Sequence, residues 1–175
     1  MREEPSDAHL LARIARGDAA GFEALVVRYQ DRFYSVARRM LGSGQEAEDA
    51  VQRAFLRVLQ KAETYRPPWK GSTWLYRVLT NVCVDAWRKR RRETLALARW
   101  EPPPRRDDGL PGDSSSVEAA LLRLPAEARA IVLLRYVDDV PYREIARIRG
   151  VSVNTVKSQL RRGKLLLRRA LRGGR

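Results

Sequence analysis

The side chains between Ser152 and Arg162 are of the types that recognise nucleic acids. Amide, hydroxyl and guanidinium groups hydrogen bond to base edges, and Lys and Arg bind phosphates. Val153, Val156 and Leu160 recur at helical spacing, which predicts one buried side. The opposite side then carries the candidate DNA-binding residues Ser152, Asn154, Thr155, Lys157, Ser158, Arg161 and Arg162. An ordinary helical hairpin with a solvated charged face is the alternative interpretation.

The stretch from 141 to 171 is predicted to position these side chains as a helix-turn-helix. Gly150 can adopt the positive φ of a sharp turn, and Ser152 offers an oxygen that caps the second helix. The second helix would then lie in a major groove. The first helix has an apolar face made of Tyr142, Ile145, Ala146 and Ile148.

A second group of candidate residues lies between 65 and 92, where aromatic residues alternate with cations and amides. Single-stranded nucleic acid needs both, because bases stack on aromatic faces and phosphates need positive charge. A helix capped by Ser72 and running to about Arg92 would carry most of the group. The alternative is that the aromatic residues belong to the core, which we expect for Trp74 and Trp87. The candidate strand-binding residues are Trp69, Lys70, Ser72, Thr73, Tyr76, Arg77, Thr80, Asn81, Arg88 and Lys89.

The acidic residues Glu46, Glu48 and Asp49 are the carboxylates that an enzyme would need. The chain has one His, His9, and no second acidic cluster to complete a metal site or an acid–base pair. Acids in the first turn of a helix also suit its positive dipole end. We therefore expect a protein-docking surface here, with no catalytic group, metal, cofactor or small-molecule substrate.

The composition favours a polyanionic partner. The 175 residues carry a net charge of +14, and the pI is about 10.9. Of the 35 basic residues 30 are Arg, a bias that base composition of the genome can also produce. The single cysteine, Cys83, lies in an apolar run and excludes an internal disulfide. A buried thiol without a redox role is expected, and the absence of a membrane-length apolar run or a visible signal peptide predicts a cytoplasmic protein.

Apolar residues recur at threes and fours along most of the chain, which predicts an all-α protein. Pro, Gly and Ser accumulate between 93 and 116, so we expect two small helical domains, 8–92 and 117–172, joined by a flexible linker. Their net charges are +7 for residues 1–92, −2 for the linker and +9 for 117–175. The helix-turn-helix belongs to the C-terminal domain.

Three runs together resemble the extracytoplasmic-function (ECF) sigma factors of bacterial RNA polymerase, members of the sigma-70 family. They are GFEALVVRYQDRFYSVARRMLGSGQEAEDAVQRAFLRVLQ, STWLYRVLTNVCVDAWRKRRR and LPAEARAIVLLRYVDDVPYREIARIRGVSVNTVKSQLRRGKLLLRRAL. The resemblance covers nearly the whole chain apart from its N-terminal tip and the linker. Several motifs in the right order make it more specific than a helix-turn-helix alone.

The resemblance implies a role for each segment. The first domain (region 2) would melt promoter DNA, with residues 69–92 reading the minus-ten element and Asn81 at the amide position of a base-binding pocket. Glu48, Asp49, Gln52 and Phe55 would dock on the clamp helices of the largest polymerase subunit. The second domain (region 4) would read the minus-thirty-five duplex and contact the polymerase flap. An anti-sigma factor is a further implied partner, and its identity, the promoter sequence and the inducing signal are not encoded in these patterns.

Two other functions are open to a sequence of this kind. A helix-turn-helix regulator that never binds polymerase would share the C-terminal domain, but its first domain would more naturally carry a ligand pocket or a dimer interface. A nuclease using Glu46, Glu48 and Asp49 would need a second carboxylate cluster, which the chain lacks.

Overall fold

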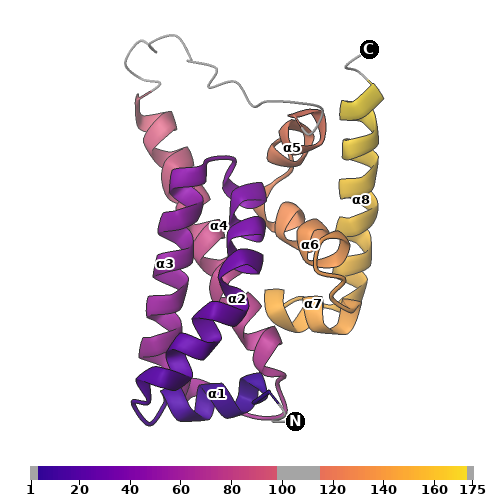
Figure 1. Ribbon diagram of the computed structural model, residues 1–175. Helices are drawn as coiled ribbons and strands as arrows, with labels where there is room; N and C mark the ends of the chain where they lie inside the picture. The colour runs from indigo at the N-terminus through magenta and orange to yellow at the C-terminus, as the bar shows by residue number, and fades with distance from the viewer. Residues whose placement is uncertain (1–3, 98–114, 173–175) are drawn as a thin grey trace.

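The computed structural model describes residues 4–97 and 115–172, and helices account for all of the regular structure in these two ranges. The all-α prediction is therefore confirmed, with two groups of helices as expected (Figure 1). The elements are α1 Asp7–Ile14, α2 Ala19–Leu41, α3 Gly44–Lys61, the short 3-10 helix η1 Ala62–Thr64, α4 Gly71–Leu97, α5 Ser115–Leu122, α6 Ala126–Tyr136, α7 Tyr142–Arg149 and α8 Val153–Arg172.

The first group packs α2, α3 and α4 side by side, with α1 across one end (Figure 1). Its core is built on aromatic rings from all three long helices. Phe33 of α2 is fully buried and stacks on Phe55 of α3 at 5.2 Å between ring centroids. Tyr76 of α4 lies 6.0 Å from the same Phe33 ring. These contacts fix the orientation of α4, which carries most of the candidate strand-binding residues.

Local sequence signals set the ends of these helices. The Asp18 side chain accepts a hydrogen bond from the Gly21 N–H at 3.1 Å and so caps α2. Gly42 ends α2 in the left-handed conformation, with φ of 80°. Helix α4 begins at Gly71, one residue before the expected cap, so Ser72 lies within its first turn and the capping prediction for Ser72 is wrong.

The helix-turn-helix is confirmed as α7 and α8. Gly150 adopts a φ of 66° at the turn, and the Ser152 hydroxyl accepts a hydrogen bond from the Thr155 N–H at 3.0 Å. Ile145, Ala146 and Ile148 are buried as predicted. Tyr142 is not, because its ring lies on the surface beneath the Arg135 guanidinium, 5.3 Å from the ring centroid.

The two groups of helices pack against each other, an arrangement that the sequence did not predict. Helices α5 and α6 contact α2, and α6 and α7 contact α4 (Figure 1). Most of the predicted linker, residues 98–114, lies outside the described residues. Helix α4 continues to Leu97, past its expected end near Arg92.

Candidate nucleic-acid interface

The polar face of α8 is exposed as the sequence predicted. The exposed members are Ser152, Asn154, Lys157, Ser158, Arg161 and Arg162, whereas Thr155 is half-buried. Ser152 and Thr155 share a hydroxyl contact at 2.9 Å, so both help to build the start of the helix. In the part of the chain that the structure describes, Lys157, Arg161 and Arg162 form no ion pair with an acidic side chain. Their charge is therefore available to a polyanion.

The side of α8 opposite this polar face packs closely against the rest of the second group of helices, so the polar face stays exposed. Val156 and Leu160 are buried as expected from their spacing. Gly163 has no side chain because α8 approaches α6 closely: a Cβ there would lie 2.7 Å from a methyl group of Val132. A rigid helix with a polar, cationic outer face can enter a major groove.

A pocket beside α4 combines aromatic faces with cations. Its cavity of about 170 Å³ is lined by Arg57, Lys61, Thr64, Trp74, Arg77, Val78 and Asn81. A neighbouring cavity of about 260 Å³ shares Trp74 and Arg77 and adds Trp69. The Arg77 guanidinium lies over the Trp69 ring, 5.1 Å from its centroid. Such a site can stack an unpaired base and bind the phosphates beside it.

The loop before α4 is fixed by its own hydrogen bonds. The Tyr65 hydroxyl donates to the Trp69 carbonyl oxygen at 2.5 Å, and the Tyr65 ring packs edge-on against Trp74. Trp69 is half-buried here. Trp74 and Trp87, which were expected in the core, are also only partly buried.

Three predicted strand-binding residues are buried and cannot contact a bound strand in this structure, so that part of the prediction is wrong. Tyr76 belongs to the aromatic core of the first group, although its hydroxyl donates to Asp138 at 2.8 Å. Thr73 donates to Glu144 at 2.9 Å, and Thr80 donates to the backbone oxygen of Tyr76 at 2.8 Å. The physical reason is that α6 and α7 cover this side of α4.

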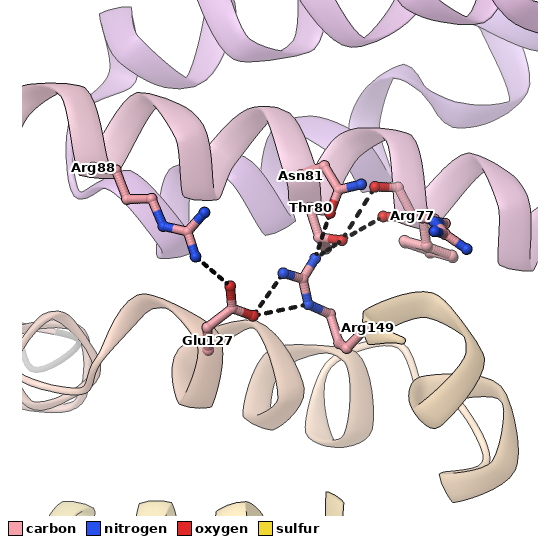
Figure 2. Close-up of polar contacts among 7 residues, drawn as sticks. Arg77, Thr80, Asn81, Arg88, Glu127 and Arg149 are labelled. Carbon is pink, nitrogen blue, oxygen red and sulfur yellow. Dashed lines mark hydrogen bonds and ion pairs between the residues drawn. The ribbon is translucent and has the colours of Figure 1, made fainter. Parts of the chain in front are cut away.

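The remaining candidates on and before α4 are exposed or half-buried, and most have a charged or polar partner. The Lys70 ammonium lies 2.5 Å from a Glu144 oxygen. The Asn81 oxygen accepts a hydrogen bond from Arg149 at 2.9 Å. Arg88 pairs with Glu127 at 3.1 Å, as Figure 2 shows, and Lys89 lies 3.8 Å from Glu93. Ser72 is half-buried in the first turn of α4.

On α3, the structure exposes Glu48, Asp49 and Gln52 but buries Phe55. Phe55 therefore forms part of the core and cannot offer its ring to another protein in this structure, so that part of the docking prediction is wrong. Leu56 is the apolar residue exposed beside them, with 54% of its surface accessible. It lies one helical turn after Gln52, so the 3.6-residue period could have identified it.

Four residues that the sequence did not single out connect the two groups of helices. Glu127, Asp138, Glu144 and Arg149 all contact side chains of α4 or of the loop before it. No local pattern marks them, since their partners lie more than sixty positions away for three of the four.

The described residues hold no cluster of three or more His, Cys, Asp or Glu side chains suited to a metal ion. Burial raises the pKa of the Cys83 thiol to about 12, which keeps it protonated and unreactive at neutral pH. Among the described helices, none is long and apolar enough to span a membrane.

Two helical modules, one with an aromatic and cationic pocket and one with a helix-turn-helix, are features of proteins that bind nucleic acids. Family comparison agrees with this division. The profile of Sigma-70 region 2 matches residues 25–93, and that of Sigma-70 region 4 matches residues 114–167.

Individual relatives narrow the class. The chain is 33% identical to the ECF RNA polymerase sigma factor SigW of Bacillus subtilis, over 93% of this chain and 95% of that one. It is 32% identical to SigM of Mycobacterium tuberculosis, over 97% and 87% of the two chains. The chain belongs to the ECF sigma factors of the sigma-70 family, as the sequence motifs predicted.

Solved structures show the same fold. CnrH, in complex with the cytosolic domain of CnrY, matches with a TM-score of 0.74 at 25% identity, over 97% of this chain and 99% of that one. The sigma factor RpoE of Bartonella quintana, at 22% identity and a TM-score of 0.71 over 88% and 98% of the chains, shares the fold. The protein is therefore a transcription initiation factor that works with core RNA polymerase on promoter DNA, and the regulator alternative is not supported.

Proposed function

We propose that the pocket beside α4 captures an unpaired base of the opened promoter strand. The observation that carries this proposal is the convergence of Trp74, Arg77 and Asn81 on one cavity, with Trp69 next to it. Opening a duplex costs about 1.4 kcal/mol per stacked step, and a base stacked on an aromatic side chain returns about 1–3 kcal/mol. A few captured bases can therefore hold a short bubble once polymerase has positioned the strand.

The exposed face of α8 takes the duplex role in this proposal. Asn154 and Arg161 are suited to base edges, and Lys157 and Arg162 to phosphates. Its cations make no ion pair among the described residues. Gly163, which has no side chain, lets α8 pack closely against α6 of the same module. In this proposal, duplex binding by α8 positions the protein on the promoter, and base capture beside α4 stabilises the opened strand.

Two variants test this division of labour in holoenzyme reconstituted from core polymerase and the full chain. Arg77→Ala and Asn81→Ala should reduce open-complex formation, measured by permanganate reactivity of unpaired thymines, at least tenfold more than they reduce duplex binding. Gln60→Ala, an exposed change on α3, is the control and should alter neither. Equal losses in both assays, or none, would reject the base-capture site. Absence of promoter-specific initiation by the wild-type holoenzyme would reject the function itself.

The face of α3 that carries Glu48, Asp49, Gln52 and Leu56 is proposed to dock on the clamp helices of the largest polymerase subunit. An exposed apolar patch rimmed by polar residues is typical of protein interfaces. Leu56→Lys should weaken binding to core polymerase at least tenfold, whereas Gln60→Lys, the same added charge one turn later, should have little effect. Comparable affinities of the two variants for labelled core would place the docking surface elsewhere.

A protein partner that holds the chain inactive is also proposed. The support is that CnrH, of similar fold and length, was solved with the cytosolic domain of CnrY bound. Copurification of the full chain from its own cells, followed by mass spectrometry of the bound proteins, tests this. A chain recovered only free or with polymerase would argue against such a partner.

A further inference from the structure

Among the described residues, every charged side chain that lines the pocket beside α4 is a cation. Arg57 and Lys61 come from α3, and Arg77 comes from α4. Asp85 lies 3.5 Å from the Arg57 guanidinium, but it does not line the cavity. Lys61 and Arg77 form no ion pair with an acidic side chain in the two ranges that the structure describes. Lys and Arg donate hydrogen bonds and accept none, so the charged groups of this pocket suit acceptor atoms only.

The neutral polar groups of the pocket leave this excess of donors in place. The Thr64 hydroxyl donates to the Lys61 backbone oxygen at 2.7 Å, so its own oxygen is left to accept. The Asn81 amide has an acceptor oxygen and two N–H donors, and it can pair with either kind of group. A base that stacks on Trp74 therefore meets several donors, one hydroxyl oxygen and one amide.

The four bases of DNA differ in the exocyclic group that they would turn toward these donors. Thymine and guanine have a carbonyl oxygen, which accepts, whereas cytosine and adenine have an amine, which donates. An amine that faces Arg77 or Lys61 loses its hydrogen bonds to water without a replacement, and an unpaired polar group of this kind is costly. A carbonyl oxygen gains a charged donor instead. The ring N–H beside that carbonyl can donate to the Thr64 oxygen.

Arg77 is the cation of the pocket whose position is most restricted. Its guanidinium lies over the Trp69 ring, 5.1 Å from the centroid, and this contact orients its planar set of N–H donors. Arg77 and Asn81 lie one helical turn apart on α4, as Figure 2 shows, and both line the same cavity. Lys61 is exposed, and its ammonium is carried on a flexible stem, so its position is less defined.

We propose that the pocket beside α4 selects bases with an exocyclic carbonyl, thymine and guanine, over cytosine and adenine, and that Arg77 determines this specificity. The proposal rests on the proposed capture of an unpaired base in the same pocket. It adds a sequence requirement to that capture, because the promoter position whose base enters the pocket then carries thymine or guanine on the captured strand.

The first measurement locates the captured position in holoenzyme reconstituted from core polymerase and the full chain. The DNA is a promoter that this holoenzyme opens, prepared with a preformed bubble so that base pairing does not influence binding. An abasic site replaces each bubble nucleotide in turn. The captured base is the one whose loss weakens binding of the wild-type holoenzyme at least about fivefold, as expected for a lost stacking contact, but not binding of the Arg77→Ala holoenzyme.

Two comparisons at that position then isolate the exocyclic group. Uracil differs from cytosine, and hypoxanthine from adenine, by a carbonyl in place of the amine, while the ring system stays the same. Wild-type holoenzyme should bind the carbonyl base of each comparison at least about fivefold more tightly, the lower end of what a well-placed contact to a base edge discriminates.

The variant Arg77→Gln tests the source of this preference. It should bring both affinity ratios below about twofold, because a Gln amide accepts as well as donates. Arg53→Gln is the matched control, since Arg53 is exposed one turn before Arg57 on α3 and does not line the cavity, and it should keep the wild-type ratios. Each ratio is taken within one variant, so a general weakening of binding does not alter it.

Three results would contradict different parts of this reasoning. If no abasic position meets both conditions, base capture itself is rejected. If uracil binds no better than cytosine and hypoxanthine no better than adenine at the captured position, the carbonyl preference is overturned and base capture stands. If Arg77→Gln keeps the wild-type ratios, another group of the pocket determines the specificity and the role of Arg77 is overturned.

Discussion

The buried guanidinium of Arg129 offers the sharpest test of how the two groups of helices are held together. Arg129 is fully buried, and it donates to the backbone oxygens of four residues rather than to a carboxylate. These are Leu121 at 2.9 Å, Leu122 at 2.6 Å, Leu124 at 2.9 Å and, at closer range, Met40. The oxygens of Met40 and Leu122 lie at the negative ends of α2 and α5. One guanidinium group thus binds backbone oxygens at the C-terminal ends of two helices, one from each group of helices.

Replacement of Arg129 by Met keeps the length of the side chain and removes every donor. A hydrogen bond from a charged donor contributes about 1.5 kcal/mol or more, so the four together contribute about 6 kcal/mol. Burial lowers the pKa of Arg129 to about 10, which corresponds to about 3 kcal/mol of unfavourable desolvation that the variant no longer carries. The difference predicts a loss of about 3 kcal/mol in the free energy of unfolding.

Urea unfolding of the full chain, followed by tryptophan fluorescence, measures this loss. Arg123→Met is the matched control, because Arg123 is exposed only six positions away and should cost less than about 0.5 kcal/mol. A difference between the two variants below about 1 kcal/mol would refute the reasoning, since water would then be satisfying the four oxygens without the guanidinium.

Three further predictions concern single groups. Asp138→Asn should raise the free energy of unfolding by about 1 kcal/mol near neutral pH, because it removes a negative charge that burial disfavours and that one oxygen, without a hydrogen-bond partner among the described residues, does nothing to offset. Burial raises the pKa of Asp138, so the wild-type protein gains stability as the pH falls toward the ordinary carboxyl range, and the advantage of the Asn variant should shrink there; a constant advantage in urea titrations would contradict this. Cys83, whose raised pKa is about 12, should resist thiol reagents near pH 8 until the protein unfolds, and rapid labelling of the native protein would contradict its burial. Arg161→Ala should weaken duplex binding by about 1–3 kcal/mol and flatten the salt dependence, and unchanged binding isotherms would place Arg161 off the DNA.

Features of the sequence that act over short range predicted the structure well. The helix-turn-helix followed from the spacing of Val156 and Leu160, the freedom of Gly150 and the capping oxygen of Ser152. Each of these signals operates within one or two turns of helix. Once the buried side of α8 was known from its apolar spacing, the exposed polar side followed as the opposite face.

Predictions about the faces of α4 and α3 were less successful. Thr73, Tyr76 and Thr80 are polar enough to suit a surface, yet they are buried, because a second group of helices packs over them. The family resemblance assigned Phe55 to a docking surface, although its helical spacing placed it on the inner face of its helix, and the structure stacks its ring on Phe33 in the core. Helical spacing gives the faces of a helix, but it does not tell which neighbour covers each face.

By itself the sequence determined the all-α fold, the two modules, their order and the sigma-factor family, because these depend on periodicity, turn residues and motif order along the chain. Only the tertiary structure decided that the modules lie against each other and that Arg149 and Glu127 meet Thr80, Asn81 and Arg88. Those contacts join residues 39 to 69 positions apart. Their strength depends on mutual burial and on pairing of opposite charges, which arise only when the chain has folded.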